Sequence, residues 1–275
     1  MKQLLIRTLT GAAYVAVMVF GTMVSPWTLL ALIVLLAVLA VWELASITCP
    51  SGGRKWMTRL LLVLSALTFA VAVWTRCRYA DINMVLVMAP YLLVLLLSFV
   101  SELYARHENP IAHLGMMALA QVYIVLPLSL LAVLAFAPLK AEGRPFWALP
   151  LAVYFFLWLN DTGAYLIGSW LGRHKLFPRI SPGKTWEGSL GGAVSALLAA
   201  VLMDYLFPFM SLWRWLGLAA VVVVFGTWGD LTESLIKRTL GIKDSGALLP
   251  GHGGILDRID SMLLAIPAAV VYLCF

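Results

Sequence analysis

Four carboxylates in the second half of the chain stand where apolar stretches meet polar sequence: Asp230, Glu233, Asp257 and Asp260. A fifth, Asp161, lies within an apolar stretch, towards its C-terminal end. On a helix, a spacing of three residues places Asp230 and Glu233 on one face, and the same holds for Asp257 and Asp260. A carboxylate inside a bilayer costs about 2.5 to 3.5 kcal/mol, so its presence there indicates a function. The alternative for Asp230 or Glu233 is a salt bridge with Lys237 at a helix end.

Carboxylate oxygens from separate helices suit a hard cation such as Mg²⁺, which commonly joins protein carboxylates to substrate phosphates. Basic residues flank the carboxylates along the sequence: Arg173, Lys175, Arg179, Lys184, Lys237, Arg238, Lys243 and Arg258. Together they predict a phosphoryl-transfer site, because that chemistry depends on positioning and neutralising charged oxygens. Such a site suits both a lipid phosphate and a nucleoside triphosphate.

Two polar segments carry further candidate phosphate ligands. In residues 243–254, glycines let backbone amides approach phosphate oxygens, and His252 is a candidate phosphate-binding side chain; a flexible turn is the alternative. Residues 181–185 read Ser-Pro-Gly-Lys-Thr, but they are not a P-loop, because Pro178 occupies the position of the first glycine. The Lys-Thr pair remains a candidate for gripping phosphate, with a cytoplasmic membrane anchor as the alternative reading of the lysine.

The elements that must position these residues are membrane helices. The chain has 275 residues, of which 63% are hydrophobic and 12% charged, and its mean hydropathy is +0.96. No basic face is long enough to follow a nucleic acid. We predict an all-α, polytopic integral membrane protein with nine transmembrane helices. Their expected ranges are 8–24, 27–48, 59–75, 84–104, 111–137, 146–170, 188–209, 215–236 and 259–275.

Orientation follows from the positive charges, because cytoplasmic loops retain lysine and arginine. Fourteen of the 19 fall on the side of the N-terminus, which is therefore predicted to be cytoplasmic, with Phe275 outside. The polar segments 171–187 and 237–258 are then cytoplasmic too. We divide the sequence into an N-terminal region of five spans, 1–137, and a C-terminal catalytic region of four spans, 138–275.

The stretch SLIKRTLGIKDSGALLPGHGGILDRID, residues 234–260, closely resembles the signature of the phosphatidate cytidylyltransferases, or CDP-diacylglycerol synthases. Its fixed positions are filled by Ser234, Lys237, Arg238, Lys243, Asp244, Gly246, Pro250, His252, Gly253, Gly254, Asp257, Arg258 and Asp260. The resemblance extends to NDTGAYLIG at 160–168, with Asn160 and Thr162 as local variants, to GRHKLFPRISPGKTWEGSLGG at 172–192 and to GDLTES at 229–234. The first five spans match in character only.

The resemblance implies a bacterial inner-membrane enzyme, with its active site facing the cytoplasm, that transfers CMP from CTP to phosphatidate and releases pyrophosphate. It also implies dependence on Mg²⁺, a second cation such as K⁺, and a homodimer. The residues that match the metal ligands are Asp230 and Asp257. The expected catalytic residues are Asp230, Asp257 and Lys237. The expected substrate-binding residues are Asp161, Ser181, Lys184, Thr185, Ser234, Arg238, Lys243, Asp244, His252, Arg258 and Asp260.

Two other classes compete with this interpretation. Intramembrane carboxylates also mark ion pathways, but a transporter is expected to carry internal repeats and carboxylates at mid-bilayer, whereas here no repeat is visible and the polar residues gather at one membrane face. The closer rivals are a CTP-dependent lipid kinase of the polyprenol type and a cytidylyltransferase acting on another lipid phosphate. Analysis of the lipid product separates the kinase from a cytidylyltransferase.

Overall fold

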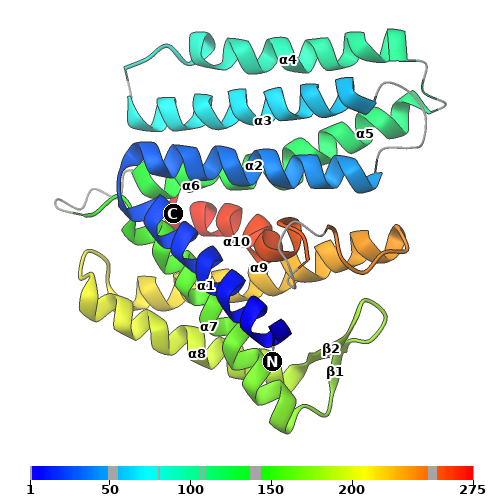
Figure 1. Cartoon of the computed structure of the whole chain (residues 1–275). Helices are drawn as coiled ribbons and strands as arrows, with labels where there is room; N and C mark the ends of the chain where they lie inside the picture. Colours follow the sequence, from blue (N-terminus) through cyan, green and yellow to red (C-terminus); the bar gives the residue numbers. More distant parts are fainter. Residues whose placement is uncertain are drawn as a thin grey trace. The chain divides into compact units, whose positions relative to one another are not determined.

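The computed structural model describes residues 2–48, 55–79, 81–105, 107, 109–136, 144–246 and 253–274. The elements, in chain order, are α1 (Lys2–Met23), α2 (Pro26–Thr48), α3 (Lys55–Arg78), α4 (Met84–Ala105), α5 (Pro110–Ala120), the π-helical turn η1 (Gln121–Val125), α6 (Leu126–Phe136), α7 (Ala148–Leu171), β1 (Lys175–Phe177), β2 (Ser181–Thr185), α8 (Trp186–Leu206), α9 (Leu212–Thr239) and α10 (Leu256–Cys274). Figure 1 shows this almost wholly helical chain.

Helices account for every predicted span, which confirms an all-α, polytopic membrane protein. Within the described residues, six helical segments are long and apolar enough to cross a membrane: Pro26–Thr48, Trp56–Arg78, Met84–Ala105, Pro110–Phe136, Trp186–Leu206 and Leu212–Thr239. The count of nine is therefore not confirmed. The described apolar part of α1, Thr8–Met23, is shorter than these six, while α7 and α10 contain the polar residues Asn160, Asp161, Asp257 and Asp260.

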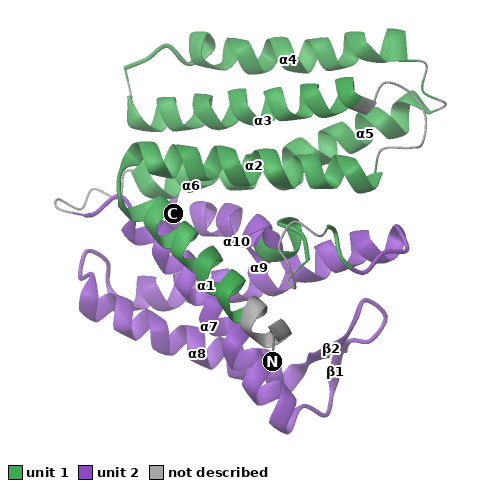
Figure 2. Cartoon of the chain, in the orientation of Figure 1, with its two compact units in different colours: residues 1–137, 244–258 green, residues 138–243, 259–275 purple. Residues whose placement is uncertain are grey.

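The chain divides into two compact units, coloured in Figure 2. The first comprises residues 1–137 and 244–258, and the second comprises residues 138–243 and 259–275. The first turn of α10 thus belongs to the first unit and the rest of α10 to the second. These units reflect packing, so the functional division at residue 138 stays a prediction.

In the first unit, α2 packs against α1, α3 and α6, and α3 packs against α4. The α2 helix is apolar on nearly all sides, and it buries large side chains such as Leu29, Ile33 and Leu44. This is the pattern of a helix at the centre of a bundle. A polar exception is Glu43, which is also buried.

In the second unit, small residues let α7 and α8 approach closely. A Cβ at Gly188 would lie 2.8 Å from the backbone oxygen of Ala164, and one at Gly163 would lie 2.9 Å from that of Gly191. Gly188 and Gly192 have the four-residue spacing that is typical of closely packed membrane helices. A Cβ at Gly229 would similarly lie 2.6 Å from the backbone oxygen of Asp260, so the backbones of α9 and α10 also meet closely.

The polar segment 171–187 contains an antiparallel hairpin that the sequence interpretation did not include. Strands β1 and β2 pair with Lys175 opposite Thr185, and in Figure 1 the hairpin projects from the adjoining ends of α7 and α8. Thr185 ends β2 and caps α8, because its hydroxyl accepts a hydrogen bond from the Gly188 amide at 3.1 Å. The Glu187 carboxylate closes the base of the hairpin, accepting from the His174 ring at 2.6 Å and from the Arg173 amide at 3.2 Å.

Candidate active site

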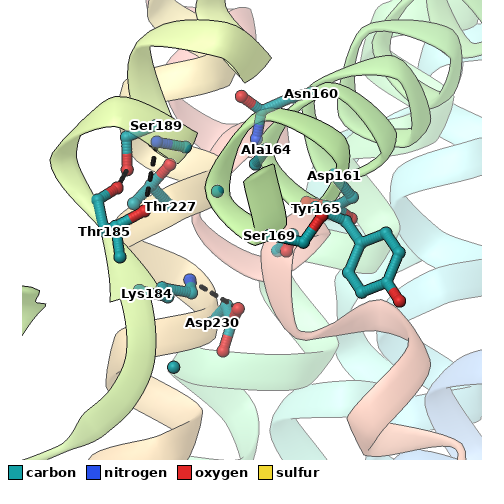
Figure 3. A pocket seen from close by; sticks show the side chains of 14 residues that line it. Asn160, Asp161, Ala164, Tyr165, Ser169, Lys184, Thr185, Ser189, Thr227 and Asp230 are labelled. Carbon is teal, nitrogen blue, oxygen red and sulfur yellow. Dashed lines mark hydrogen bonds and ion pairs between the residues drawn. The ribbon is translucent and has the colours of Figure 1, made fainter. Parts of the chain in front are cut away.

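A pocket of about 490 Å³ opens in the second unit, between α7, β2, α8, α9 and α10. Figure 3 shows its polar lining. The charged side chains among its lining residues are Asp161, Lys184 and Asp230. Neutral polar side chains of Asn160, Tyr165, Ser169, Thr185, Ser189, Thr227 and Ser261 complete the polar lining. The pocket therefore combines hydrogen-bonding groups with charges of both signs.

Lys184 and Asp230 form an ion pair across this pocket. The Lys184 Nζ lies 2.5 Å from an Asp230 carboxylate oxygen, and about a quarter of each side chain is exposed. Because Lys184 lies on the hairpin strand β2 and Asp230 lies on α9, the hairpin and a membrane helix supply one partner each. A phosphate would compete with Asp230 for the ammonium group, and a cation would compete with Lys184 for the carboxylate.

The other carboxylates of the second unit gather near Asp230. Asp260 lies close enough to Asp161, Asp230 and Glu233 for their charges to interact. Glu233 is almost fully buried and forms an ion pair with Lys237, the two atoms being 2.5 Å apart. The salt bridge considered for this helix end thus forms at Glu233, whereas Asp230 pairs with Lys184. The hydroxyl of Ser234 donates to Asp230 at 3.3 Å.

This donor set fits a hard cation. Asp161 and Asp230 bring carboxylate oxygens to the pocket from two different helices, and Asp260 adds a third carboxylate beside them. Oxygen ligands of this kind are those that Mg²⁺ prefers. The chemistry of the side chains is therefore compatible with a Mg²⁺ ion bound together with phosphate groups.

Asp257 binds backbone amides of two residues near the ends of the glycine-containing segment 243–254. Its carboxylate accepts hydrogen bonds from the amide of Gly254 at 2.8 Å and from the amide of Ser245 at 3.2 Å. Gly253 has a φ of +83°, a left-handed conformation that favours glycine, and a Cβ there would press against Asp257. Asp257 thus shapes the start of α10 in the first unit, while Asp230 lies in the second unit.

Glu43 accepts hydrogen bonds from the same part of the chain. Its carboxylate accepts from the Ser245 hydroxyl, from the Ile255 amide at 2.8 Å and from the Leu256 amide at 3.3 Å. All three partners therefore lie in the matched stretch 234–260, and Leu256 begins α10. An acidic residue inside an apolar helix was the signal that could have placed Glu43 among the site residues.

Of the remaining predicted site residues that the structure describes, Ser181 is half-buried and the others are exposed: Arg238, Lys243, Asp244 and Arg258. Arg238 donates from Nε to the backbone oxygen of Ile180 at 3.5 Å, which links the end of α9 to the hairpin turn. Ser181 begins β2, Lys243 and Asp244 are exposed, and the backbone oxygen of Arg258 accepts from the Tyr14 hydroxyl at 3.0 Å. His252 lies outside the described residues.

Tyr165, Ser189, Thr227 and Ser261 line the pocket but were not predicted. The sequence signal for the first two was their place in the matched stretches 160–168 and 172–192. Two histidines of the first unit, His107 and His113, are buried. Their side chains are 7% and 3% exposed, and both bind the Glu102 carboxylate through Nδ1. His113 also meets the Thr58 hydroxyl at 3.1 Å.

Part of this sequence is similar to known proteins. A phosphatidate cytidylyltransferase of Staphylococcus aureus (strain COL) is 50% identical over 118 residues, which are 42% of this chain and 45% of the relative. Over the same lengths, the enzymes of Staphylococcus haemolyticus and Staphylococcus epidermidis are 47% and 48% identical. The chain thus matches less than half the length of these relatives. The model of the cytidylyltransferase family matches residues 5–275, so the chain belongs to this family.

Proposed function

We propose that this protein transfers CMP from CTP to phosphatidate, giving CDP-diacylglycerol and pyrophosphate. The observation that carries the proposal is the Lys184–Asp230 pair in a polar pocket among apolar helices. A lipid phosphate and a nucleotide must meet at such a place, because one substrate comes from the bilayer and the other from water. The name of the staphylococcal relatives supports phosphatidate as the acceptor.

The reaction needs no protein nucleophile. An oxygen of the phosphatidate phosphate attacks the α-phosphorus of CTP, and the bond to the β,γ-pyrophosphate breaks. The chain's task is then to hold two anions in line and to neutralise their charge. Lys184 would bind a phosphate in the pocket, and Lys237, Arg238, Lys243 and Arg258 are the further cations proposed for substrate phosphates. Polar pocket residues such as Asp161 and Thr185 would orient the substrates.

We propose Asp230 and Asp257 as ligands of Mg²⁺, with Asp260 beside the site. Bound Mg²⁺ would supply neutralisation of the triphosphate oxygens. A second cation such as K⁺ and assembly as a homodimer are part of the same proposal. We further propose that the protein lies in the bacterial inner membrane with this site facing the cytoplasm, where CTP is found; the excess of lysine and arginine in the segments around the site supports that orientation.

Two labels on CTP test the reaction directly. Purified protein is incubated with phosphatidate, Mg²⁺ and CTP labelled at the α-phosphate or, separately, at the γ-phosphate, and the lipids are extracted. The α-label should enter the lipid fraction as CDP-diacylglycerol, while the γ-label should stay in water as pyrophosphate. A CTP-dependent lipid kinase would give the reverse distribution, and that result would overturn the proposal.

A further inference from the structure

Glu43 is a buried carboxylate whose partners, among the described residues, lie about 200 positions further along the chain. Its side chain belongs to α2, and the residue is 7% exposed. The three groups that donate to it are the Ser245 hydroxyl and the amides of Ile255 and Leu256. Burying a carboxylate is costly unless hydrogen bonds compensate it, and here they come from a single polar segment.

Two glycines, Gly246 and Gly254, leave room for the Glu43 carboxylate. A Cβ at Gly246 would lie 2.9 Å from the Glu43 carboxyl carbon, and a Cβ at Gly254 would overlap a carboxylate oxygen. Neither glycine has a positive φ among the described backbone. Their need for glycine therefore comes from the space that Glu43 occupies and not from an unusual backbone conformation.

Glu43 and Asp257 accept hydrogen bonds from the same two stretches of backbone, residues 244–246 and 253–257. In the first stretch, Ser245 donates its hydroxyl to Glu43 and its amide to Asp257. In the second stretch, Gly254 donates its amide to Asp257, and the following residue, Ile255, donates its amide to Glu43. The two carboxylates thus join residues 244–246 to residues 253–257. A substitution of either carboxylate should therefore alter the position of the other.

We infer that Glu43 is a positioning residue for the proposed cytidylyl transfer: it fixes residues 244–246 and 253–256 and, through them, the carboxylate of Asp257. Glu43 itself need not touch substrate. Its role parallels that of outer-shell partners of metal ligands, whose loss typically lowers metal affinity or activity about 10- to 100-fold. The predicted effect on kinetics rests on the proposed function, whereas the predicted effect on the structure around Glu43 does not.

The test variant is Glu43→Gln, which keeps the shape of the side chain but turns one acceptor oxygen into a donor. That donor must then face the amide hydrogen of Ile255 or of Leu256. We expect a loss of about 10- to 100-fold in kcat/KM per folded molecule, together with a higher Mg²⁺ concentration for half-maximal rate. The double variant Glu43→Gln with Ser245→Ala should be less impaired than the product of the two single effects, because the two side chains share one hydrogen bond.

Glu102→Gln is the matched control. Glu102 is another buried carboxylate of the first unit, bound to His107 and His113 and outside the proposed site. Its substitution should lower thermal stability while leaving kcat/KM per folded molecule and the Mg²⁺ dependence unchanged. If Glu43→Gln behaves in the same way, Glu43 is merely structural and the inference is overturned.

Hydrogen exchange separates this inference from the proposed function. In Glu43→Gln, the amides of Ile255 and Leu256 should exchange faster than in the wild type, whereas Glu102→Gln should leave them protected. This readout needs no substrate, so it stands even if the wild-type protein transfers no CMP. If Glu43→Gln does not fold, Ser245→Ala serves in its place, and unchanged exchange together with unchanged kinetics in that variant contradicts the inference.

Discussion

At the scale of single residues, the surroundings of the Lys184 side chain give the strongest support for phosphate binding. Its ammonium group reaches into a pocket and pairs there with Asp230. A lysine that served only as a cytoplasmic membrane anchor would need no such partner. The ion pair is partly exposed, so its own contribution to stability is small, and the value of Lys184 should lie in binding.

Lys184→Gln should therefore weaken the reaction and leave folding intact. We expect kcat/KM for CTP to fall about 10- to 1,000-fold, because one charge that stabilises the developing phosphate charges is lost. Steady-state kinetics with purified variants measure this. The control is Arg214→Gln, at the other end of α9, which should keep the wild-type rate. Equal rates for both variants would remove Lys184 from the site.

At the scale of elements, the glycines of α7 and α8 set how closely the two sides of the pocket approach. The backbone oxygen of Ala164 and the hydroxyl of Thr185 both lie within 3 Å of the place where a Cβ at Gly188 would stand. The first of these atoms belongs to the backbone and cannot swing away. Thr185 and the neighbouring Lys184 must move if the helices separate, so packing and the site are coupled here.

Gly188→Ala should destabilise the protein by about 1 to 3 kcal/mol, the usual cost of overpacking a tight contact. Thermal unfolding in detergent measures the change. Gly115→Ala, on α5, is the control, because a Cβ there meets nothing within 4 Å. It should be neutral or stabilise its helix by about 0.5 to 1 kcal/mol. A Gly188→Ala protein as stable as this control would contradict the packing argument.

Hydropathy was sufficient to predict the helices, because each of them lies in a mostly apolar stretch of sequence. It could not predict the hairpin, whose strands have only three and five residues and include Pro182 and Gly183 in place of an alternating apolar pattern. The pairing of Glu102 with His107 and His113 was missed for a different reason. Glu102 lies on α4, His113 lies on α5 and His107 lies between the two helices, so their meeting depends on tertiary packing and not on one helical face.

The carboxylates Asp161, Asp230, Asp257 and Asp260 were expected to gather at one membrane face. Within the second unit, Asp161, Asp230 and Asp260 do lie near one another, whereas Asp257 belongs to the first unit. The partner of each charge was not predictable. Sequence spacing offered Lys237 to Asp230 along one helix, whereas Lys184 reaches it from the hairpin. Such contacts depend on tertiary packing, which a single helical face does not reveal.

At the scale of the whole molecule, the charge distribution predicts that Lys184 and Lys243 face the cytoplasm and that Phe275 lies outside. A cysteine placed beside Lys243, in a variant whose native cysteines are replaced, should resist membrane-impermeant thiol reagents added to intact cells. It should react once the membrane is opened, which serves as the internal control. Labelling from outside intact cells would reverse the predicted orientation.

The central claim is that the pocket around Asp230 is the active site. Neutralising Asp230 should therefore abolish the reaction without unfolding the chain.

The most direct measurement is the rate of CMP transfer per folded molecule in Asp230→Asn, titrated with Mg²⁺. Asn keeps the shape of the side chain but removes the charge, so we expect a loss of at least about 100-fold. Asp257→Asn should lose as much, and the double variant should be little worse, because ligands of one metal act as a unit. Asp204→Asn, on α8 outside the pocket, is the control with wild-type behaviour. A near-normal rate with an unchanged Mg²⁺ dependence in Asp230→Asn would contradict the account.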